Sequence, residues 1–374
     1  MNESQMLEKK LLILGTRGIP AKHGGFETFA EGFALDMVSR GWDVTVYCQL
    51  ETGSKITETY WQGVRCINIP VPYTSAVGTI FFDLKSILHA LKQEGVVLTL
   101  GYNTAIFSIL HRIARQPNIM NMDGVEWKRE KWSSVKKVWL YCNEWLGARL
   151  ANHLVADHPE IKRHLQRHTN EKKITVIPYG ADSIKSASTK PLEQYGLTAG
   201  NYAILIARPE PENSILEVVR SFVKASPGIP LVVLGNYDPE NNPYHRQVLD
   251  AGDSSVLFVG AIYESDAVSS LRYHAKVYIH GHTVGGTNPS LIEAMAAGNP
   301  VIAHGNVFNR WVVGDGGIFF DDEISLCNAL ELCADEDLLK QNVEKIVERH
   351  QSKFRPEMIH NSYEQELVKL IPNN

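Results

Sequence analysis

Residues 280–303 read HGHTVGGTNPSLIEAMAAGNPVIA, and this stretch predicts the fold of the second half of the chain. An apolar strand ends at His280, a glycine-rich loop follows, and a helix is expected to open near Asn288. The proline after Asn288 suits the first helical turn, because its missing N–H would have no partner there. The apolar run Pro300–Ala303 then returns to strand. This order is typical of a parallel sheet covered by helices, so it predicts an α/β fold.

The same alternation extends outward through the whole chain. In the first half the predicted strands are Lys10–Leu14, Asp43–Tyr47, Val64–Ile67, Val96–Leu100, Asn118–Met122, His153–Ala156 and Lys173–Ile177. In the second half they are Tyr202–Ile206, Pro230–Leu234, Val256–Val259, Val277–His280, Pro300–Ala303 and Ile318–Phe320. Apolar spacing predicts helices at Phe26–Ser39, Thr79–Glu94, Ala105–Arg115, Ser133–Leu150, Ser214–Ala225, Ser265–Tyr273 and Asn288–Ala297, and throughout the chain after residue 323.

The length of 374 residues suits two domains. The polar, turn-rich segment Tyr179–Pro191 reads as the linker between two strand–helix alternations. We therefore predict two doubly wound, Rossmann-like domains, residues 1–182 and 183–355. Such domains bind nucleotide-containing ligands at the carboxyl ends of their strands, so a cleft between the two domains is the expected site.

Composition narrows the functional class. A net charge of −5 argues against a general nucleic-acid binder. The five cysteines are scattered without a CxxC pair, which suits a reducing compartment. No apolar run approaches the ~20 residues that span a bilayer. We expect a cytoplasmic protein.

The loop after the first strand reads GTRGIPAKHGGFET (residues 15–28). Gly24 and Gly25 stand at the start of a predicted helix, whose unpaired N–H groups and positive dipole end suit a phosphate. The alternative is a flexible loop that only turns the chain. The spacing G-x-x-G is not the dinucleotide fingerprint, which disfavours an oxidoreductase.

The loop before the helix near Asn288 offers a second anion site. Thr287, Asn288 and the amides that follow can receive a diphosphate. Glu293 falls about one turn into the helix, where its carboxylate could accept hydrogen bonds from both ribose hydroxyls. The alternative for Glu293 is an ordinary carboxylate on a helix surface.

Several motifs in a fixed order resemble family 4 of the retaining glycosyltransferases, and the resemblance covers nearly the whole chain. They are EAMAAGNPV (293–301), IPYGAD (177–182) and ARPEPEN (207–213), and, for a bacterial subgroup that includes rhamnosyltransferases of surface-polysaccharide synthesis, GTRGIP (15–20), GGFET (24–28) and DGVEWK (123–128).

This resemblance implies the GT-B fold: two Rossmann-like domains facing a central cleft, with a C-terminal helix at 356–374 crossing back onto the first domain. Residues 1–182 would bind the acceptor and residues 183–355 the nucleotide sugar. The implied reaction moves a hexose or deoxyhexose, such as rhamnose, from a nucleoside diphosphate to a sugar hydroxyl of a polysaccharide or lipid-linked precursor. Retention at the anomeric carbon, no metal and no further cofactor are also implied.

The resemblance assigns roles to individual residues. Arg208 would pair with the diphosphate and stabilise it as a leaving group, Glu293 would hold the ribose, and Asp123 would reach the transferred sugar. His282 is expected to contact the sugar as well. The other expected donor ligands are Gly24, Gly25, Gly285, Gly286, Thr287, Asn288, Pro289 and Ser290, and the expected acceptor ligands are Arg17, Glu126 and Trp127. A simple turn is the competing interpretation for Asp123, and a surface ion pair for Arg208.

Two positions depart from the family pattern. The family has glutamate eight residues before Glu293, where this chain has Gly285. It has lysine near position 213, where this chain has Asn213. Recognition of the sugar and support of the leaving group are therefore expected to differ, with the helix N-terminus, Arg17 or His282 compensating.

Two patterns suggest metal ligands but are interpreted otherwise. His280 and His282 form H-x-H, yet two side chains cannot complete a site that needs three or four. Asp335-Glu-Asp337 matches D-x-D but lies between predicted helices, where a helix cap is expected. No metal site is predicted.

Basic and aromatic residues are interleaved in EWKREKWSSVKKVW (126–139). This pattern predicts contact with an anionic membrane that carries a lipid-linked acceptor. A solvated helix face with inward tryptophans, or an acceptor-sugar platform, are the alternatives.

Two other functions remain open on the sequence. A nucleotide-sugar epimerase shares this architecture but needs acid and base carboxylates around the sugar. A non-catalytic nucleotide-sugar-binding protein would explain the departures at Gly285 and Asn213.

Overall fold

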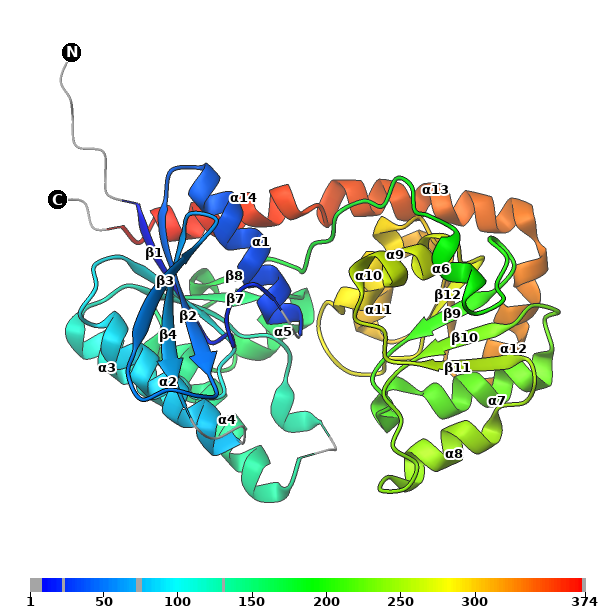
Figure 1. Cartoon of the computed structure of the whole chain (residues 1–374), viewed down its shortest axis with the longest axis horizontal. Helices are drawn as coiled ribbons and strands as arrows, with labels where there is room; N and C mark the ends of the chain where they lie inside the picture. The colour runs from blue at the N-terminus through cyan, green and yellow to red at the C-terminus, as the bar shows by residue number, and fades with distance from the viewer. Residues whose placement is uncertain (1–8, 22–23, 72–75, 130–131, 372–374) are drawn as a thin grey trace, which may run out of the picture. The chain divides into compact units, whose positions relative to one another are not determined.

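The computed structural model describes residues 9–21, 24–71, 76–129 and 132–371. The chain divides into two compact units (Figure 1). Unit 1 consists of Met1–Pro178 with Ile359–Asn374, and unit 2 is Tyr179–Met358. Each unit is a sheet covered by helices, as the alternating pattern predicts.

The sheet of unit 1 has eight strands in the order β3-β4-β2-β1-β5-β6-β7-β8. Their bounds are β1 Lys10–Leu14, β2 Asp43–Leu50, β3 Thr57–Trp61, β4 Val64–Pro70, β5 Val96–Leu100, β6 Asn118–Asn121, β7 His153–Ala156 and β8 Ile174–Val176. All neighbours are parallel except the antiparallel pair β3 and β4. The sequence prediction omitted β3, because this edge strand is almost wholly exposed and shows no apolar alternation.

The helices described in unit 1 are α1 Gly25–Ser39, α2 Ala76–Ala90, α3 Ser108–Ala114, α4 Ser134–Leu150, α5 Pro159–Leu165 and, from Ile359 onward, α14 Pro356–Val368. Alternate strand residues face opposite sides of the sheet. Leu11 and Ile13 pack with α1 and α14 in one core. Leu12 and Leu14 pack with α2 in the other.

The sheet of unit 2 has six parallel strands in the order β11-β10-β9-β12-β13-β14. The strands are β9 Ala203–Ile206, β10 Leu231–Leu234, β11 Val256–Gly260, β12 Val277–His280, β13 Val301–His304 and β14 Gly317–Phe320. The helices are α6 Lys190–Glu193, α7 Ile215–Ala225, α8 Pro243–Ala251, α9 Ser265–Tyr273, α10 Pro289–Ala296, α11 Val307–Val313, α12 Glu323–Glu331 and α13 Glu336–Lys353. Separate apolar cores fill the two faces of the sheet.

Strand order places one switch point in each unit. In unit 1 the chain builds outward from β1 through β2 and then returns to β5 on the other side of β1. In unit 2 it builds from β9 through β10 and β11 and returns to β12. Open α/β sheets bind ligands at the carboxyl ends of the two strands that flank such a point. The strand order therefore predicts ligand sites at the loops after β1 and β5, and at those after β9 and β12.

Candidate active site

The loops after β9 and β12 in unit 2 pack tightly together. The backbone N–H and the hydroxyl of Thr283 both donate to the Glu212 carbonyl, each at 2.9 Å. Gly281 has no space for a side chain, since a Cβ would lie 2.4 Å from the Asn213 carbonyl oxygen. A larger residue at 281 would push the loops apart, so the glycine fixes the geometry of this switch point.

Arg208 follows β9 and its side chain is exposed. The loop is tied through its backbone, since the Arg208 carbonyl accepts from the Asn213 side-chain amide at 2.8 Å. Within the described residues no ion pair joins the Arg208 guanidinium to a carboxylate. Asn213 is 2 % exposed, so it acts as an internal brace of the loop rather than a second cation beside Arg208.

The N-terminus of α10 is capped by its own sequence. The Asn288 side chain accepts from the Ser290 N–H at 3.0 Å, and Pro289 occupies the first turn. The Ser290 hydroxyl lies 2.7 Å from the Tyr278 hydroxyl and donates to the Ile206 carbonyl at 3.3 Å. Of the predicted donor ligands here, Asn288 and Ser290 thus have side chains already engaged within the unit. The preceding Gly285 is exposed, whereas Thr287 is buried.

Glu293 lies one turn into α10, as expected. Its Oε2 forms an ion pair with the buried guanidinium of Arg272 at 2.7 Å, while the side chain stays 34 % exposed. Among the described residues no partner contacts Oε1. The buried arginine holds the carboxylate in one orientation and leaves one oxygen for a ligand.

His280 and His282 stack with ring centroids 4.2 Å apart and planes at 5°. His280 is buried, and burial, with the neighbouring His282 and His304, holds its pKa well below the ordinary value. Neither histidine belongs to a potential three-ligand group in the described part of the chain.

In unit 1, Gly15 sits at the end of β1 with φ +82°, and a Cβ there would lie 2.1 Å from the Leu100 carbonyl oxygen. The first loop can therefore cross close to β5. At the start of α1, next to Gly24 and Gly25, the Glu27 carboxylate accepts from the Arg17 N–H at 3.0 Å. Glu27 thus places a carboxylate in the first turn of α1, near the helix end at which the sequence suggested a phosphate, and its negative charge favours a hydroxyl-bearing ligand there.

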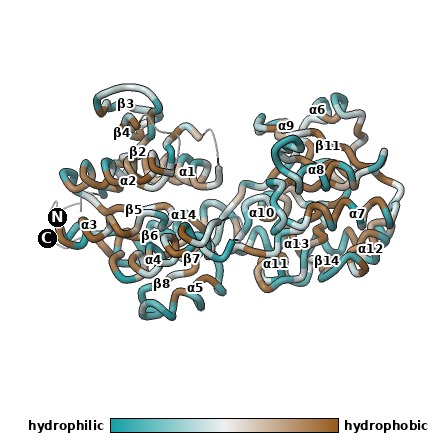
Figure 2. Tube along the Cα trace, turned by 90° about the horizontal axis from the view of Figure 1, so that it is seen from below, coloured by the Kyte–Doolittle hydropathy of each residue, from teal (hydrophilic) through white to brown (hydrophobic). Residues whose placement is uncertain are grey.

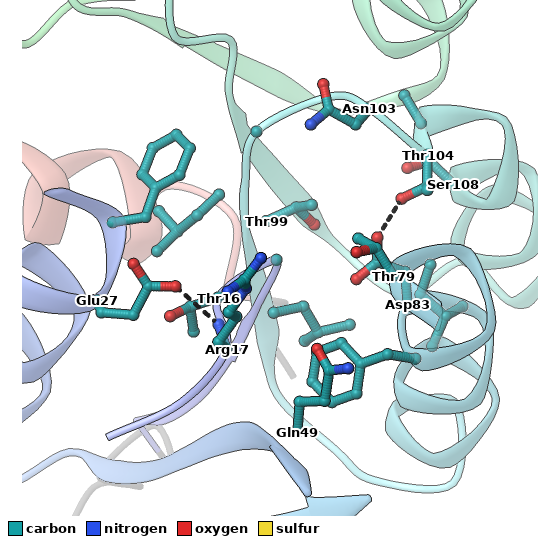
Figure 3. Close-up of a pocket in the computed structure, with 18 residues that line it drawn as sticks. Thr16, Arg17, Glu27, Gln49, Thr79, Asp83, Thr99, Asn103, Thr104 and Ser108 are labelled. Carbon is teal, nitrogen blue, oxygen red and sulfur yellow. Dashed lines mark hydrogen bonds between the residues drawn. The ribbon is translucent and has the colours of Figure 1, made fainter. Parts of the chain in front are cut away.

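A cavity of about 240 Å³ lies at the switch point between β1 and β5. Its lining comprises Leu14, Gly15, Thr16, Arg17, Phe26, Glu27, Gln49, Thr79, Phe82, Asp83, Ile87, Thr99, Leu100, Gly101, Asn103, Thr104, Ala105 and Ser108. In Figure 3, Glu27 and Asp83 stand on opposite sides with Arg17 between them. The set combines hydroxyl, amide, carboxylate and guanidinium groups with two aromatic rings, which suits a sugar.

Asp83 is the buried acid of this cavity, and the sequence analysis missed it. The Thr104 hydroxyl donates to its Oδ2 at 2.7 Å, yet burial dominates and raises the pKa of Asp83 to about 6. Its polar position within the apolar helix α2 was the available signal. Which strands flank it depends on the sheet order, which no local pattern gives.

Asp123 follows β6 with φ +47°, and its N–H donates to the Asn121 side chain at 2.8 Å. This geometry is a turn, and the side chain is only half-buried. The Tyr102 hydroxyl fixes the segment by donating to the Gly124 carbonyl at 3.2 Å and accepting from the Glu126 N–H at 2.8 Å.

Glu126 and Trp127, predicted as acceptor ligands, have side chains engaged within unit 1. The two Glu126 carboxylate oxygens accept from Arg129 at 2.6 Å and Trp132 at 3.1 Å. The Trp127 indole donates to buried Glu144 at 3.0 Å.

Glu144 is also the centre of a group that the sequence analysis missed. Its Oε1 lies 2.7 Å from His164 Nε2 and 3.2 Å from His168 Nε2. Within the described residues these three side chains form the one cluster with a ligand set for a metal ion. The contacts of the three side chains are also accounted for as hydrogen bonds. Through them Glu144 on α4 holds Trp127 and the histidines at the end of α5.

The D-x-D prediction is confirmed as a cap: Asp335 precedes α13 and its side chain accepts from the Leu338 N–H at 2.9 Å. None of the helices in the described part of the chain combines the length and apolar character needed to cross a bilayer.

Comparison with known proteins gives two domain matches. Residues 206–336 match the model described as glycosyl transferases group 1. Residues 8–182 match a domain of unknown function, DUF1972. None of the curated proteins compared with the chain matches it.

Solved structures match over nearly the whole chain. Sucrose-phosphate synthase from Thermosynechococcus elongatus is 18% identical, with a TM-score of 0.76 over 97% of this chain and 99% of that one. HepE of Anabaena in complex with UDP and glucose is 16% identical, with a TM-score of 0.76 over 96% and 100%. An alpha,alpha-trehalose-phosphate synthase (UDP-forming) from Burkholderia vietnamiensis is 9% identical, with a TM-score of 0.73 over 96% and 100%.

These likenesses confirm the predicted fold, GT-B. The group 1 match covers the switch point that carries Arg208, Glu293 and the N-terminus of α10. The fold and the matched domain together support a glycosyltransferase of the GT-B fold.

Proposed function

We propose that this protein is a retaining glycosyltransferase that moves a hexose or deoxyhexose from a nucleoside diphosphate to a sugar hydroxyl. The observation that carries the proposal is the switch point of unit 2. There the loop of Arg208 packs against the loop that leads to the N-terminus of α10. Within the described residues the exposed arginine has no acidic partner, and the first turns of α10 present an oriented carboxylate with one oxygen that has no partner. This set matches the needs of a diphosphate and a ribose.

Arg208 is proposed to pair with the diphosphate and to stabilise the charge that grows as the bond to the sugar breaks. The amides at the start of α10 add a positive dipole end. Glu293, held through Oε2 by Arg272, presents Oε1 to the ribose hydroxyls. His282 and Asp123 are proposed to contact the transferred sugar.

The cavity of unit 1 is proposed to bind the acceptor sugar. Phe26 and Phe82 offer apolar faces, and Asp83, Gln49 and Arg17 offer hydrogen bonds. Retention and independence from a metal follow from the family resemblance: the leaving phosphate takes the acceptor proton on the face from which it departs. Rhamnose as the sugar, and a surface-polysaccharide or lipid-linked precursor as the acceptor, complete the proposal.

The first test measures release of nucleoside diphosphate from UDP-, GDP- and dTDP-sugars, with and without a lipid-linked acceptor extract. We expect acceptor-dependent release from one donor. Arg208→Ala should lower kcat by about 100-fold or more, since it removes a charged group that acts in the transition state. Glu293→Gln should mainly raise the KM for the donor.

Arg220→Ala is the matched control, because Arg220 is an exposed arginine on α7 of the same unit. Equal loss in Arg208→Ala and Arg220→Ala would contradict the assignment of the site. Interconversion of the donor without release would indicate an epimerase. Tight donor binding without turnover would indicate a binding protein.

A further inference from the structure

Three neighbouring helices of unit 1 expose an unusual number of large apolar side chains. On α4 these are Val135 at 81 % and Val138 at 63 % exposure, with Trp139 and Trp145 near 40 %. The set also includes Ile106, Ile109 and Ile113 of the 105–114 segment, and Val77, Phe81 and Leu88 of α2. We call these ten residues the apolar face. Figure 1 shows α2, α3 and α4 side by side, and hydrophobic stretches run along α2 in Figure 2.

The exposed residues of α4 recur at helical spacing, on the side opposite its packed residues. Positions 135, 138, 139 and 145 lie around one side, whereas the buried residues Leu140, Asn143, Glu144 and Gly147 lie around the other. The usual polarity of a surface helix is thus partly inverted in α4. The polar residues Asn143 and Glu144 are buried, whereas the valines and tryptophans are exposed. Packing among the described residues of unit 1 does not explain the outward set.

The exposed charged side chains of these three helices are all positive. Five cations are distributed over the three helices, namely Lys85, Arg112, Lys136, Lys137 and Arg149. The same helices contain two carboxylates: Asp83 lines the cavity, and Glu144 is 1 % exposed. In a chain with net charge −5 this is a local reversal of sign. Arg149 lies 3.9 Å over the Trp145 ring, so a cation and an exposed aromatic ring form one unit there.

The apolar face adjoins the cavity of unit 1. Trp139 donates its indole N–H to the Asn103 carbonyl at 2.9 Å, and Asn143 accepts from the Ile106 N–H at 2.9 Å. Asn103 and Ala105 line the cavity, so α4 holds the turn that forms its wall. On α2, Phe82 faces the cavity while its neighbour Phe81 is exposed on the apolar face.

We propose that the apolar face docks unit 1 onto an anionic membrane and so presents the cavity to the headgroup of a lipid-linked sugar. Exposed valine, isoleucine and tryptophan enter the interface, and the surrounding lysines and arginines meet lipid phosphates. The docking stands on the surface alone. Only the link to an acceptor rests on the proposed function of the cavity.

The segment predicted from sequence, residues 126–139, shares Val135, Val138 and Trp139 with the apolar face. Trp127 and Trp132 of residues 126–139 donate to Glu144 and Glu126 within the unit and do not belong to the apolar face. The charge pattern also favours a membrane over a second copy of the chain. A symmetric dimer through this face would place cations against cations, since the helices expose no carboxylate to pair with them.

The experiment measures co-sedimentation of the full-length protein with vesicles of phosphatidylcholine alone or mixed with phosphatidylglycerol. We expect binding to the mixed vesicles that falls as salt rises. Val135→Ser with Val138→Ser should weaken it about tenfold, and Arg112→Glu with Lys136→Glu by about tenfold or more. Ile324→Ser and Lys224→Glu, exposed positions on unit 2, are the matched controls.

Cys142 provides a direct readout of position. It is the one exposed cysteine of the five and lies on the outward side of α4. A polarity-sensitive fluorophore on Cys142 should shift to the blue when mixed vesicles are added. Sedimentation without this shift would assign binding to another surface and overturn the proposal.

Two further outcomes would also overturn it: no binding to mixed vesicles, or a dimer dispersed by Val135→Ser with Val138→Ser in analytical ultracentrifugation. Vesicle binding is read without any substrate. A failure to transfer sugar would therefore contradict the proposed function and leave the docking surface standing, and the reverse also holds.

Discussion

Asp83 shows how a single side chain can link the stability of unit 1 to its cavity. Burial raises its pKa to about 6, although the Thr104 hydroxyl stabilises the charged form. An acid whose pKa is raised on folding stabilises the fold fully below its unfolded pKa, and that contribution is lost as pH rises through the folded value. At neutral pH the charged Asp83 therefore destabilises the fold, as is common for groups that serve a ligand.

We predict that Asp83→Asn is more stable than the wild type at pH 8 by about 1–2 kcal/mol. A full shift of two pKa units would give about 3 kcal/mol, and contact with solvent in the cavity reduces it. The gain should build up between about pH 4 and pH 6 and be flat above about pH 7. Urea unfolding at several pH values measures this. A gain in stability that does not depend on pH would contradict the raised pKa of Asp83. An unchanged KM for the acceptor in the Asp83→Asn variant would contradict a role of Asp83 in the acceptor site.

At the scale of elements, α14 completes the core of unit 1. Its residues Ile359, Tyr363 and Leu367 are buried with α1 and the strands. Polar contacts fix its register: the Trp42 indole donates to Glu364 at 2.9 Å, and Arg40 forms an ion pair with the same carboxylate at 2.9 Å. The helix is positioned by pairing along its length, not only by burial.

The hydrogen bond from the Asn121 amide to the Tyr363 hydroxyl, at 2.7 Å, is buried. We predict that Tyr363→Phe lowers the free energy of unfolding by about 1–3 kcal/mol, because the Asn121 amide loses its acceptor in the core. Chemical denaturation measures the change. Tyr60→Phe is the control, since Tyr60 is 70 % exposed and its loss should cost little. Equal effects of the two substitutions would show that the buried bond contributes nothing.

Most of the helices that were not predicted from the sequence are short. The sequence prediction omitted α5, α6, α8 and α11, each of nine residues or fewer. Both α5 and α8 begin with a proline after a capping residue, His158 and Asn242, so a start signal was present. With so few turns the apolar spacing has no room to repeat, and only packing against the sheet stabilises such helices.

For the whole molecule, unit 1 is discontinuous in sequence, because residues from Ile359 return to a core built by the first 178 residues. Each of Ile359, Tyr363 and Leu367 buries a large side chain, worth about 1.5–3 kcal/mol. Their sum is comparable with the total stability of a domain, about 5–15 kcal/mol. The last helix should thus decide whether unit 1 folds.

We predict that ending the chain after Arg355 selectively unfolds unit 1. Six of the seven tryptophans lie in unit 1, so tryptophan fluorescence reports on it, while calorimetry reports on both units. The truncated chain should lose the cooperative fluorescence transition but keep one calorimetric transition from unit 2. Ile359→Ala should lower the midpoint temperature of the fluorescence transition of unit 1 without abolishing that transition. An unchanged fluorescence transition in the truncated chain would contradict the role of α14.

The sequence by itself determined the α/β class, the positions of most strands, the start of α10 and the cap at Asp335, because these depend on residues within a few positions of one another. The tertiary structure decided which strands flank each switch point, and hence that Asp83, Gln49 and Arg17 line one cavity. It also decided that Trp127 and Trp132 turn inward while Val135 and Trp145 face outward. The spacing of apolar residues in the sequence predicts which side of an element is buried, but it does not predict which other element covers that side. Contacts such as that between Asn121 and Tyr363, 242 residues apart, are set by packing of whole elements.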